Sequence, residues 1–383
     1  MIRNLLARWF NPVDRLPAGM YAYKTPPGAS RTYRLHLRLE LDGRGLLLVN
    51  AATVLHLNPT AAEYAYYLVH STPAEQAAQQ VASRYKVTPE QAGHDYAEFV
   101  RYVESLLDRP DLDPVSALDI DRRPPYSGSL SAPYRLDCAL TYRWSSGALP
   151  NQSAELTTRE WQIILDKAWE AGIPHVTFTG GEATLRPDLV DLLDHAEGLG
   201  MVTGLLTDGL RLADSAYLDS ILQAGLDHAM IVLRPQWEET WESLVALTYW
   251  TDALEADLHL AAHLTLTSEN AGRAPDLLER LAASEIHAVS LSASRPSLYE
   301  ALQSAREHAA RLNLSLIRDM PVPYSGANPL ATENQADEAP PGAGRAWLYV
   351  EPDGDVRADQ SAARVLGNFL HDPWEVIWNS SSR

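Results

Sequence analysis

The sequence predicts an α/β protein built around a partial (β/α)6 barrel of the TIM type, with a small winged-helix-like unit before it. Two patterns support this prediction. Between residues 134 and 320, six apolar strand-like runs alternate with six amphipathic helical segments, as expected for a parallel sheet with right-handed crossovers. Upstream, residues 33–107 read as three strands followed by three helices.

Composition narrows the classes of function. The formal net charge of −19 argues against a nucleic-acid partner, because phosphate contacts need a basic face. No apolar run reaches the roughly 18 residues of a membrane-spanning helix, and the first residues lack a signal-peptide cleavage pattern, so we expect no membrane partner. The only cysteine is Cys138, which excludes an internal disulfide and favours a cytoplasmic location.

The N-terminal unit, residues 1–108, is predicted from its turns and helix starts. Its strands are expected at Tyr33–Glu40, Leu46–Val49 and Thr53–Leu57, from residue alternation and the Asp-Gly turn that follows the first. Asn58-Pro59 begins the first helix, and two Thr-Pro pairs, at Thr72 and Thr88, begin the others.

Residues 34–107 resemble the RiPP recognition element, a PqqD-like fold that binds leader peptides of ribosomally synthesised, post-translationally modified peptides (RiPPs). The resemblance rests on LLLVN, on the Leu57-Asn58-x-Thr60 turn and on the apolar stripe of the last helix. It implies that a precursor (leader) peptide adds as a strand beside the third strand and lies against the last helix. The implied peptide-binding residues are Thr53, Val54, Leu55, His56, Leu57, Tyr96, Phe99, Val100 and Val103. A plain winged-helix dimerisation module is the alternative.

Residues 109–133 are rich in Pro, Asp and Ser and are predicted to be a linker. Residues 134–320 form the predicted barrel. Its expected strands are Arg135–Thr141, Pro174–Thr179, Val202–Thr207, Ala229–Leu233, Leu260–Thr267 and Ala288–Ala293. The helices between and after them are expected at Thr158–Glu170, Pro187–Glu197, Asp214–Ala224, Trp237–Leu254, Ala271–Ala283 and Ser297–Arg311.

The second barrel strand ends in Gly180-Gly181-Glu182. Paired glycines allow the backbone to approach a ligand closely, and strand ends of this kind form the sites of barrel enzymes. The stretch resembles the GGEPT segment of radical S-adenosylmethionine (SAM) enzymes, where the turn holds the amino end of SAM. The resemblance implies a vestigial SAM-type site at Gly180, Gly181, Glu182 and Asp208. Alternatively, the turn is kept for packing, and Glu182 caps the next helix or pairs with an arginine.

The segment PYRLDCALTYRWSSGALPNQSAELTT resembles the first strand and cluster loop of the same family. The three cysteines that bind the family's iron–sulfur cluster fall here on Trp144, Ala148 and Asn151, and Cys138 lies too early to replace one. Residues 321–383, with an Asp353-Gly354 hairpin, resemble the SPASM/twitch extension of radical SAM peptide-modifying enzymes, with Pro341 and Asp359 at two of its cysteine positions. We therefore expect no iron–sulfur cluster, no metal, no catalytic residue and no cofactor, with retained SAM binding at the turn as the alternative.

Polar residues at the predicted strand ends offer one further candidate site at the barrel mouth. They are Glu182, Asp208, Arg234, Asn270, Ser292 and Arg295. His259 and His263 lie on one strand face, but four strand residues separate them by about 13 Å, which is too far to chelate one metal.

Together these features predict a catalytically inactive radical SAM-like pseudoenzyme that binds a precursor peptide and acts as a chaperone or scaffold in RiPP biosynthesis. A further predicted partner is an active radical SAM enzyme or another modifying enzyme. One alternative is a SAM- or nucleotide-binding enzyme that uses the Gly-Gly-Glu turn without radical chemistry. The other is a structural subunit of an active radical SAM homologue.

Overall fold

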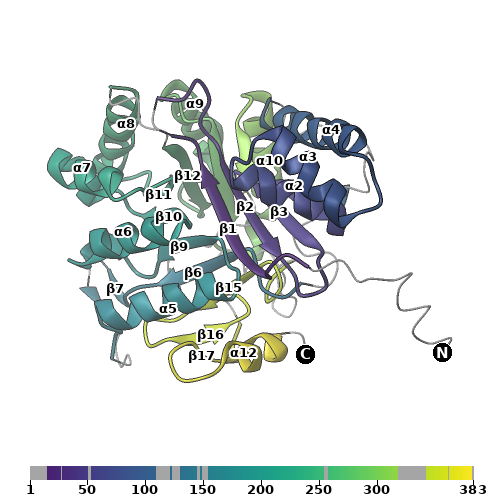
Figure 1. The fold of residues 1–383 in the computed structure, drawn as a ribbon. Coiled ribbons are helices and arrows are strands. Elements are labelled where there is room, and N and C mark those ends of the chain that lie inside the picture. Colours follow the sequence, from purple (N-terminus) through teal and green to yellow (C-terminus); the bar gives the residue numbers. More distant parts are fainter. Residues whose placement is uncertain are drawn as a thin grey trace. The chain divides into compact units, whose positions relative to one another are not determined.

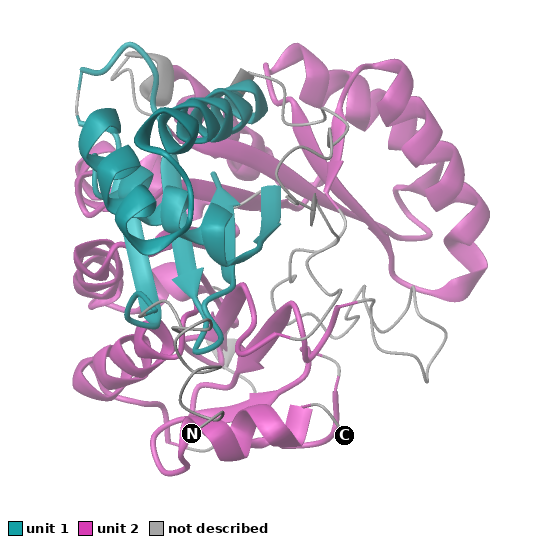
Figure 2. Ribbon diagram, turned by 45° about the vertical axis from the view of Figure 1, so that its right-hand side comes forward, with its two compact units in different colours: residues 1–127 teal, residues 128–383 magenta. Residues whose placement is uncertain are grey.

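The computed structural model describes residues 15–26, 28–50, 53–108, 121–122, 130–144, 147–148, 154–253, 258–317, 342–360 and 362–381 (Figure 1). The chain divides into two compact units, residues 1–127 and residues 128–383 (Figure 2). Each unit has its own hydrophobic core.

Unit 1, as far as it is described, contains an antiparallel sheet in the order β1-β2-β3-β4-β5. The strands are β1 Gly19–Lys24, β2 Arg34–Leu39, β3 Gly45–Val49, β4 Thr53–Leu57 and β5 Asp121–Arg122. The helices are α2 Pro59–Val69, α3 Ala74–Arg84 and α4 Pro89–Asp108. The three predicted strands and three predicted helices are present, and the sheet has two further strands, β1 and β5.

Local signals explain where these helices begin. The Asn58 side chain accepts a hydrogen bond from the backbone N–H of Ala61 at 2.8 Å, and Pro59 occupies the first helical position of α2. Thr88 accepts in the same way from Gln91 at the start of α4. Thr72 does not cap α3, whose N-cap is Pro73 without a side-chain hydrogen bond. The helices bury Tyr64 and Phe99 against the sheet.

Unit 2 contains a ten-stranded sheet among its described residues, in the order β14-β13-β12-β11-β10-β9-β6-β15-β16-β17. Every pair from β14 to β15 is parallel, and the two pairs after β15 are antiparallel. The parallel strands are β6 Arg135–Ala139, β9 His175–Thr179, β10 Val202–Thr207, β11 His228–Leu233, β12 His259–Leu266, β13 Ala288–Ala293, β14 Ser315–Ile317 and β15 Trp347–Val350. The predicted α/β fold with a parallel sheet is confirmed.

Six helices follow these strands: α5 Thr158–Glu170, α6 Leu189–Leu199, α7 Ser215–Gln223, α8 Glu238–Ala253, α9 Ala274–Ala283 and α10 Tyr299–Arg311. They pack on one face of the sheet and bury Trp161, Phe178 and Trp241 there. Thr157 and Glu160 form the expected capping box of α5. Leu254, the last residue of one predicted helix, lies outside the described residues.

The C-terminal segment joins this sheet directly. β15 pairs in parallel with β6, so Leu348 and Val350 enter the same core as the helices. β16 Asp355–Arg357, β17 Gly367–Asn368 and α12 Trp374–Ser381 follow. In the segment predicted as a cluster loop, β7 Arg143–Trp144 and β8 Gly147–Ala148 form a two-stranded ribbon. Among the described helices of both units, none has the length and apolar character needed to cross a membrane.

Candidate functional site

The Gly180-Gly181 turn packs against the segment that leaves β6. The N–H of Gly181 donates to the Thr141 carbonyl, and the N–H of Glu182 donates to the Arg143 carbonyl, both at 2.8 Å. A Cβ on Gly180 would lie 2.6 Å from the Thr141 oxygen, and one on Gly181 only 2.0 Å from the Arg143 oxygen. Gly180 also has a φ of +123°. The space that these glycines leave is therefore filled by the protein's own backbone.

Glu182 joins the ends of β9 and β10 through its buried carboxylate. Oε1 accepts hydrogen bonds from the Thr184 N–H at 3.0 Å, the Thr184 hydroxyl at 2.6 Å and the Thr207 hydroxyl at 2.7 Å. Oε2 accepts one from the Asp208 N–H at 2.7 Å. The side chain thereby caps the short helix Ala183–Leu185, as expected if the turn is kept for packing.

The charge state of Glu182 is balanced between opposing effects. Burial and the neighbouring Asp208 carboxylate raise the pKa of Glu182 to about 7, whereas the hydrogen bonds from Thr184, Asp208 and Thr207 lower it. Asp208 itself accepts from the Leu210 N–H. The structure thus brings together Gly180, Gly181, Glu182 and Asp208 at the carboxyl ends of two adjacent strands. That they bind SAM stays a prediction.

The positions aligned with cluster cysteines do not supply thiolates. Trp144 lies half-buried in β7, Ala148 lies in β8, and Asn151 and Pro341 lie outside the described residues. Cys138 is wholly buried in the core beneath the helices, and this burial raises the pKa of its thiol. The residues present do not fit a cluster held by three thiolates of this chain. Among the described residues, no group of three or more His, Cys, Asp or Glu side chains could hold a metal.

The face of the sheet opposite the helices carries a polar network that the sequence analysis missed. His263 on β12 lies 3.0 Å from the Ser290 hydroxyl through Nδ1, and 3.0 and 3.1 Å from the Thr265 and Ser292 hydroxyls through Nε2. Burial lowers the pKa of His263 to about 3, so the imidazole is neutral at pH 7. The signal was present in the sequence: polar residues alternate with apolar ones in HLAAHLTL and AVSLSA.

The six polar residues predicted at the barrel mouth do not form one ring of contacts. Ser292 belongs to the His263 network, while Glu182 and Asp208 contact each other. The Arg234 guanidinium lies 4.4 Å from the centre of the Trp237 ring. Asn270 donates to the Thr265 carbonyl and accepts from the Thr267 N–H, and Arg295 directly precedes the short helix Pro296–Leu298.

In unit 1, most of the predicted peptide-binding side chains belong to the core. Phe99 and Val103 are buried, and Tyr96 packs with its ring centre 5.8 Å from that of Tyr64. The side chains of Thr53, Val54, Leu55 and Leu57 are also buried; those of His56 and Val100 are partly exposed. A peptide that pairs with β4 would therefore contact its main chain rather than these side chains. Peptide binding at these residues stays a prediction.

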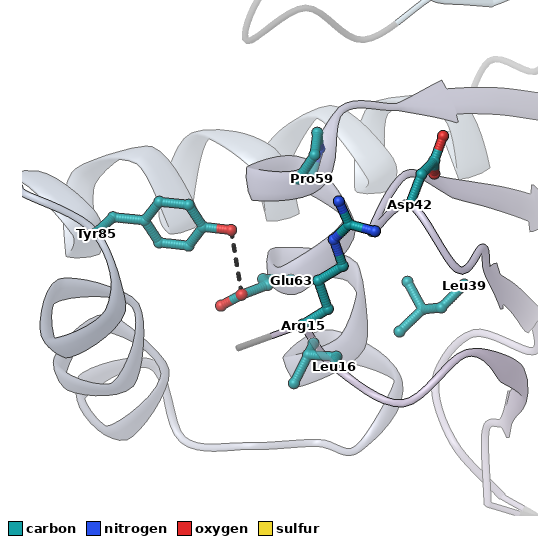
Figure 3. Close-up of a pocket in the computed structure, with 8 residues that line it drawn as sticks. Arg15, Leu16, Leu39, Asp42, Pro59, Glu63 and Tyr85 are labelled. Carbon is teal, nitrogen blue, oxygen red and sulfur yellow. Dashed lines mark hydrogen bonds between the residues drawn. The ribbon is translucent and has the colours of Figure 1, made fainter. Parts of the chain in front are cut away.

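Unit 1 also has a pocket of about 210 Å³ next to the buried Glu63 (Figure 3). Glu63 Oε1 accepts from Arg84 Nε at 2.8 Å and from the Tyr85 hydroxyl at 3.2 Å. Oε2 is buried without a hydrogen-bond partner among the described residues. Burial raises the pKa of Glu63, and Arg84 opposes this rise. Arg15, which donates to the Leu41 carbonyl, lies beside the pocket.

The packing of the turn predicts that Gly181→Ala is strongly destabilising. The added Cβ overlaps the Arg143 carbonyl oxygen, so the backbone must shift, at a cost of about 3 kcal/mol. Gly198→Ala is the matched control: its Cβ meets no atom within 4 Å in α6, and alanine should raise helix stability by up to about 1 kcal/mol. Urea unfolding measures the free energy of unfolding of both variants. Equal stability of Gly181→Ala and the native protein would contradict the described turn.

The Glu63–Arg84 pair predicts a pH-dependent loss of stability in Arg84→Ala. Without the guanidinium the folded pKa of Glu63 rises further above its unfolded value, so stability falls as pH rises through the folded pKa. We expect a loss of about 1–3 kcal/mol at pH 8 and a smaller loss at pH 5. Urea midpoints at both pH values, with hydrogen exchange in α2, test this. The exposed Arg101→Ala on α4 is the control, and an equal loss at both pH values would exclude the coupling.

No family model matches the chain, but individual proteins do. A PqqA peptide cyclase of Streptomyces rochei is 30% identical over 259 residues, which cover 61% of this chain and 70% of the relative. The PqqA peptide cyclase of Rhizobium meliloti (strain 1021) is 27% identical over 290 residues, 68% of this chain and 75% of the relative.

Among solved structures, Streptococcus suis SuiB bound to S-adenosylmethionine matches with a TM-score of 0.57 and 13% identity, covering 93% of this chain and 88% of SuiB. SuiB bound to its precursor peptide SuiA matches with a TM-score of 0.54 and 14% identity, covering 89% and 86%. At this identity the likeness shows the fold.

These comparisons correct two predictions. Relatives named as cyclases point to an enzyme, which contradicts the prediction of an inactive pseudoenzyme that serves as a chaperone or scaffold. They also contradict the prediction of no cofactor and no iron–sulfur cluster, because the radical SAM class to which these relatives belong binds SAM and iron–sulfur clusters. The error came from treating the missing thiolates as proof of lost activity. The identity over most of the Streptomyces rochei relative shows that this chain belongs to the family of the PqqA peptide cyclases, which are radical SAM peptide-modifying proteins.

Proposed function

We propose that this protein is an enzyme that modifies a ribosomally made precursor peptide and uses SAM as a cofactor. The observation that carries the proposal is the 30% identity to a PqqA peptide cyclase across 70% of that relative. The fold supports it, since the likeness to SuiB extends over 93% of this chain.

The proposed division of the chain is a recognition-element-like domain at 1–108, a linker at 109–133, the barrel at 134–320 and a SPASM/twitch-like extension at 321–383. The separation of the compact units after Ser127 supports a recognition unit that folds around its own core. β15, which lies within residues 321–383, pairs in parallel with β6 in the sheet of unit 2.

We propose that the peptide is recognised at the β4 edge of unit 1. An edge strand presents backbone N–H and C=O groups that an extended peptide can pair with, and this supplies affinity without a large side-chain pocket. The burial of most β4 side chains supports backbone recognition. That SuiB has been crystallised with its precursor peptide supports a peptide substrate for proteins of this fold.

SAM is proposed to bind at the Gly180–Glu182 turn. Glu182 Oε2 accepts a single hydrogen bond among the described residues, whereas Oε1 accepts three, so Oε2 is the oxygen with lone-pair capacity for a further donor. The ammonium group of SAM could therefore donate to Oε2 without displacing the Asp208 N–H. The residues of this chain do not fit a cluster held by three of its own thiolates, so no reaction step is assigned to such a cluster.

The first test of this function is chemical change in a peptide. The purified full chain is incubated with SAM, a reductant and synthetic PqqA peptide, or with short peptides encoded beside its gene, and the products are weighed by mass spectrometry. We expect a defined mass change in one peptide that requires both protein and SAM. Unchanged masses for all peptides, with SAM binding intact, would rule out the proposed substrate class.

A second test concerns the carboxylate that is proposed to hold SAM. Glu182→Gln removes the charge that pairs with the SAM ammonium, so calorimetry should show at least tenfold weaker binding, which corresponds to about 1.4 kcal/mol. Glu170→Gln at the end of α5, a surface position of equal charge, is the control. Equal SAM affinity in native protein and Glu182→Gln would remove Glu182 from the site.

A further inference from the structure

One of the two outer strands of the described unit 1 sheet, β5, comes from the segment that the sequence predicts to be a linker. β5, Asp121–Arg122, pairs antiparallel with β4 in the register Leu55 with Arg122 and His56 with Asp121. The β4 edge proposed for the precursor peptide therefore already carries a strand of the same chain.

Only one strand can occupy this edge at a given residue. Each backbone N–H and C=O on the outer side of β4 bonds a single neighbouring strand, so β5 and a peptide exclude each other at Leu55 and His56. β5 covers two of the five residues of β4; the other three have no register partner on that side among the described residues.

Two prolines, Pro124 and Pro125, follow β5 in the sequence, and proline has no N–H to donate to a ladder. A peptide strand along the whole of β4 can form more backbone hydrogen bonds than the two described residues of β5 do, so such a peptide is suited to replace β5.

We infer that β5 competes in cis with the precursor peptide for the β4 edge, and that a peptide which pairs antiparallel with β4 displaces it. This inference rests on the proposed peptide site. In the free protein β5 covers an edge that would otherwise be open to pairing with a second copy. β5 also lowers the apparent peptide affinity, because only the fraction of molecules in which the β4 edge is open can bind the peptide. A permanent cover that no peptide displaces is the competing explanation.

The test weakens β5 in the full chain. Only one of two neighbouring N–H groups in an antiparallel pair faces the partner strand, so both are removed together in Asp121→Pro/Arg122→Pro. Fluorescence polarisation with labelled PqqA peptide should then show about tenfold tighter binding than the native protein. Ser116→Pro/Ala117→Pro places two prolines in the same linker outside β5 and should leave the affinity unchanged.

A disulfide that holds β5 against β4 tests the opposite effect, a loss of peptide affinity. His56 and Asp121 are register partners, and a disulfide in His56→Cys/Asp121→Cys should hold β5 in place. Peptide affinity should fall at least tenfold in the oxidised protein and recover on reduction. Equal affinity in the locked, native and double-proline forms would overturn the competition.

Hydrogen exchange in the peptide-free protein separates this inference from the proposed function. The double-proline variant should exchange its Leu55 or His56 amide faster than native protein does. If exchange accelerates but no form binds peptide, the peptide site fails and the competition fails with it. If peptide binds equally to all forms and exchange does not change, the peptide site stands and the role of β5 is overturned.

Discussion

The buried carboxylate of Glu182 fixes the geometry at the carboxyl ends of β9 and β10. It is in contact with Thr184 on the turn after β9 and with Thr207 and Asp208 at the end of β10. A buried charge of this kind is costly unless it is hydrogen-bonded. These three residues donate four hydrogen bonds to it, which favours the ionised form, while burial and the Asp208 carboxylate favour the protonated form. The pKa near 7 reflects this balance, and ligand charge could shift it in either direction.

The glycine turn that precedes Glu182 packs closely against the backbone that follows β6. Gly180 and Gly181 permit the backbone from Thr141 to Arg143 to lie against the turn, so the segment after β6 and the end of β9 form one layer of hydrogen-bonded backbone. The segment that aligns with a cluster loop thus contacts the segment that aligns with a SAM turn.

The two units place their polar side chains differently with respect to their sheets. In unit 2 the helices bury the apolar side of the sheet, so the polar residues around His263 lie on its other face, where hydroxyl and imidazole groups satisfy each other. In unit 1 nearly all β4 side chains are buried, so the proposed peptide recognition at β4 relies on its main chain. The main chain carries little sequence information, so the proposed selectivity for one peptide needs side-chain contacts as well, for which the partly exposed His56 on β4 and Val100 on α4 are candidates.

The sequence by itself determined the α/β class, the alternation of strands and helices in unit 2, three of the strands and the three helices of unit 1, and the positions of most helix starts. These follow from local periodicity and from capping residues such as Asn58 and Thr157, which act within one turn of chain. It also determined that one cysteine is present. Only the tertiary structure decided that Gly181 faces the Arg143 carbonyl, that β5 covers β4, and that His263 meets Ser290 from the neighbouring strand. These are contacts between residues far apart in sequence, which no local pattern specifies.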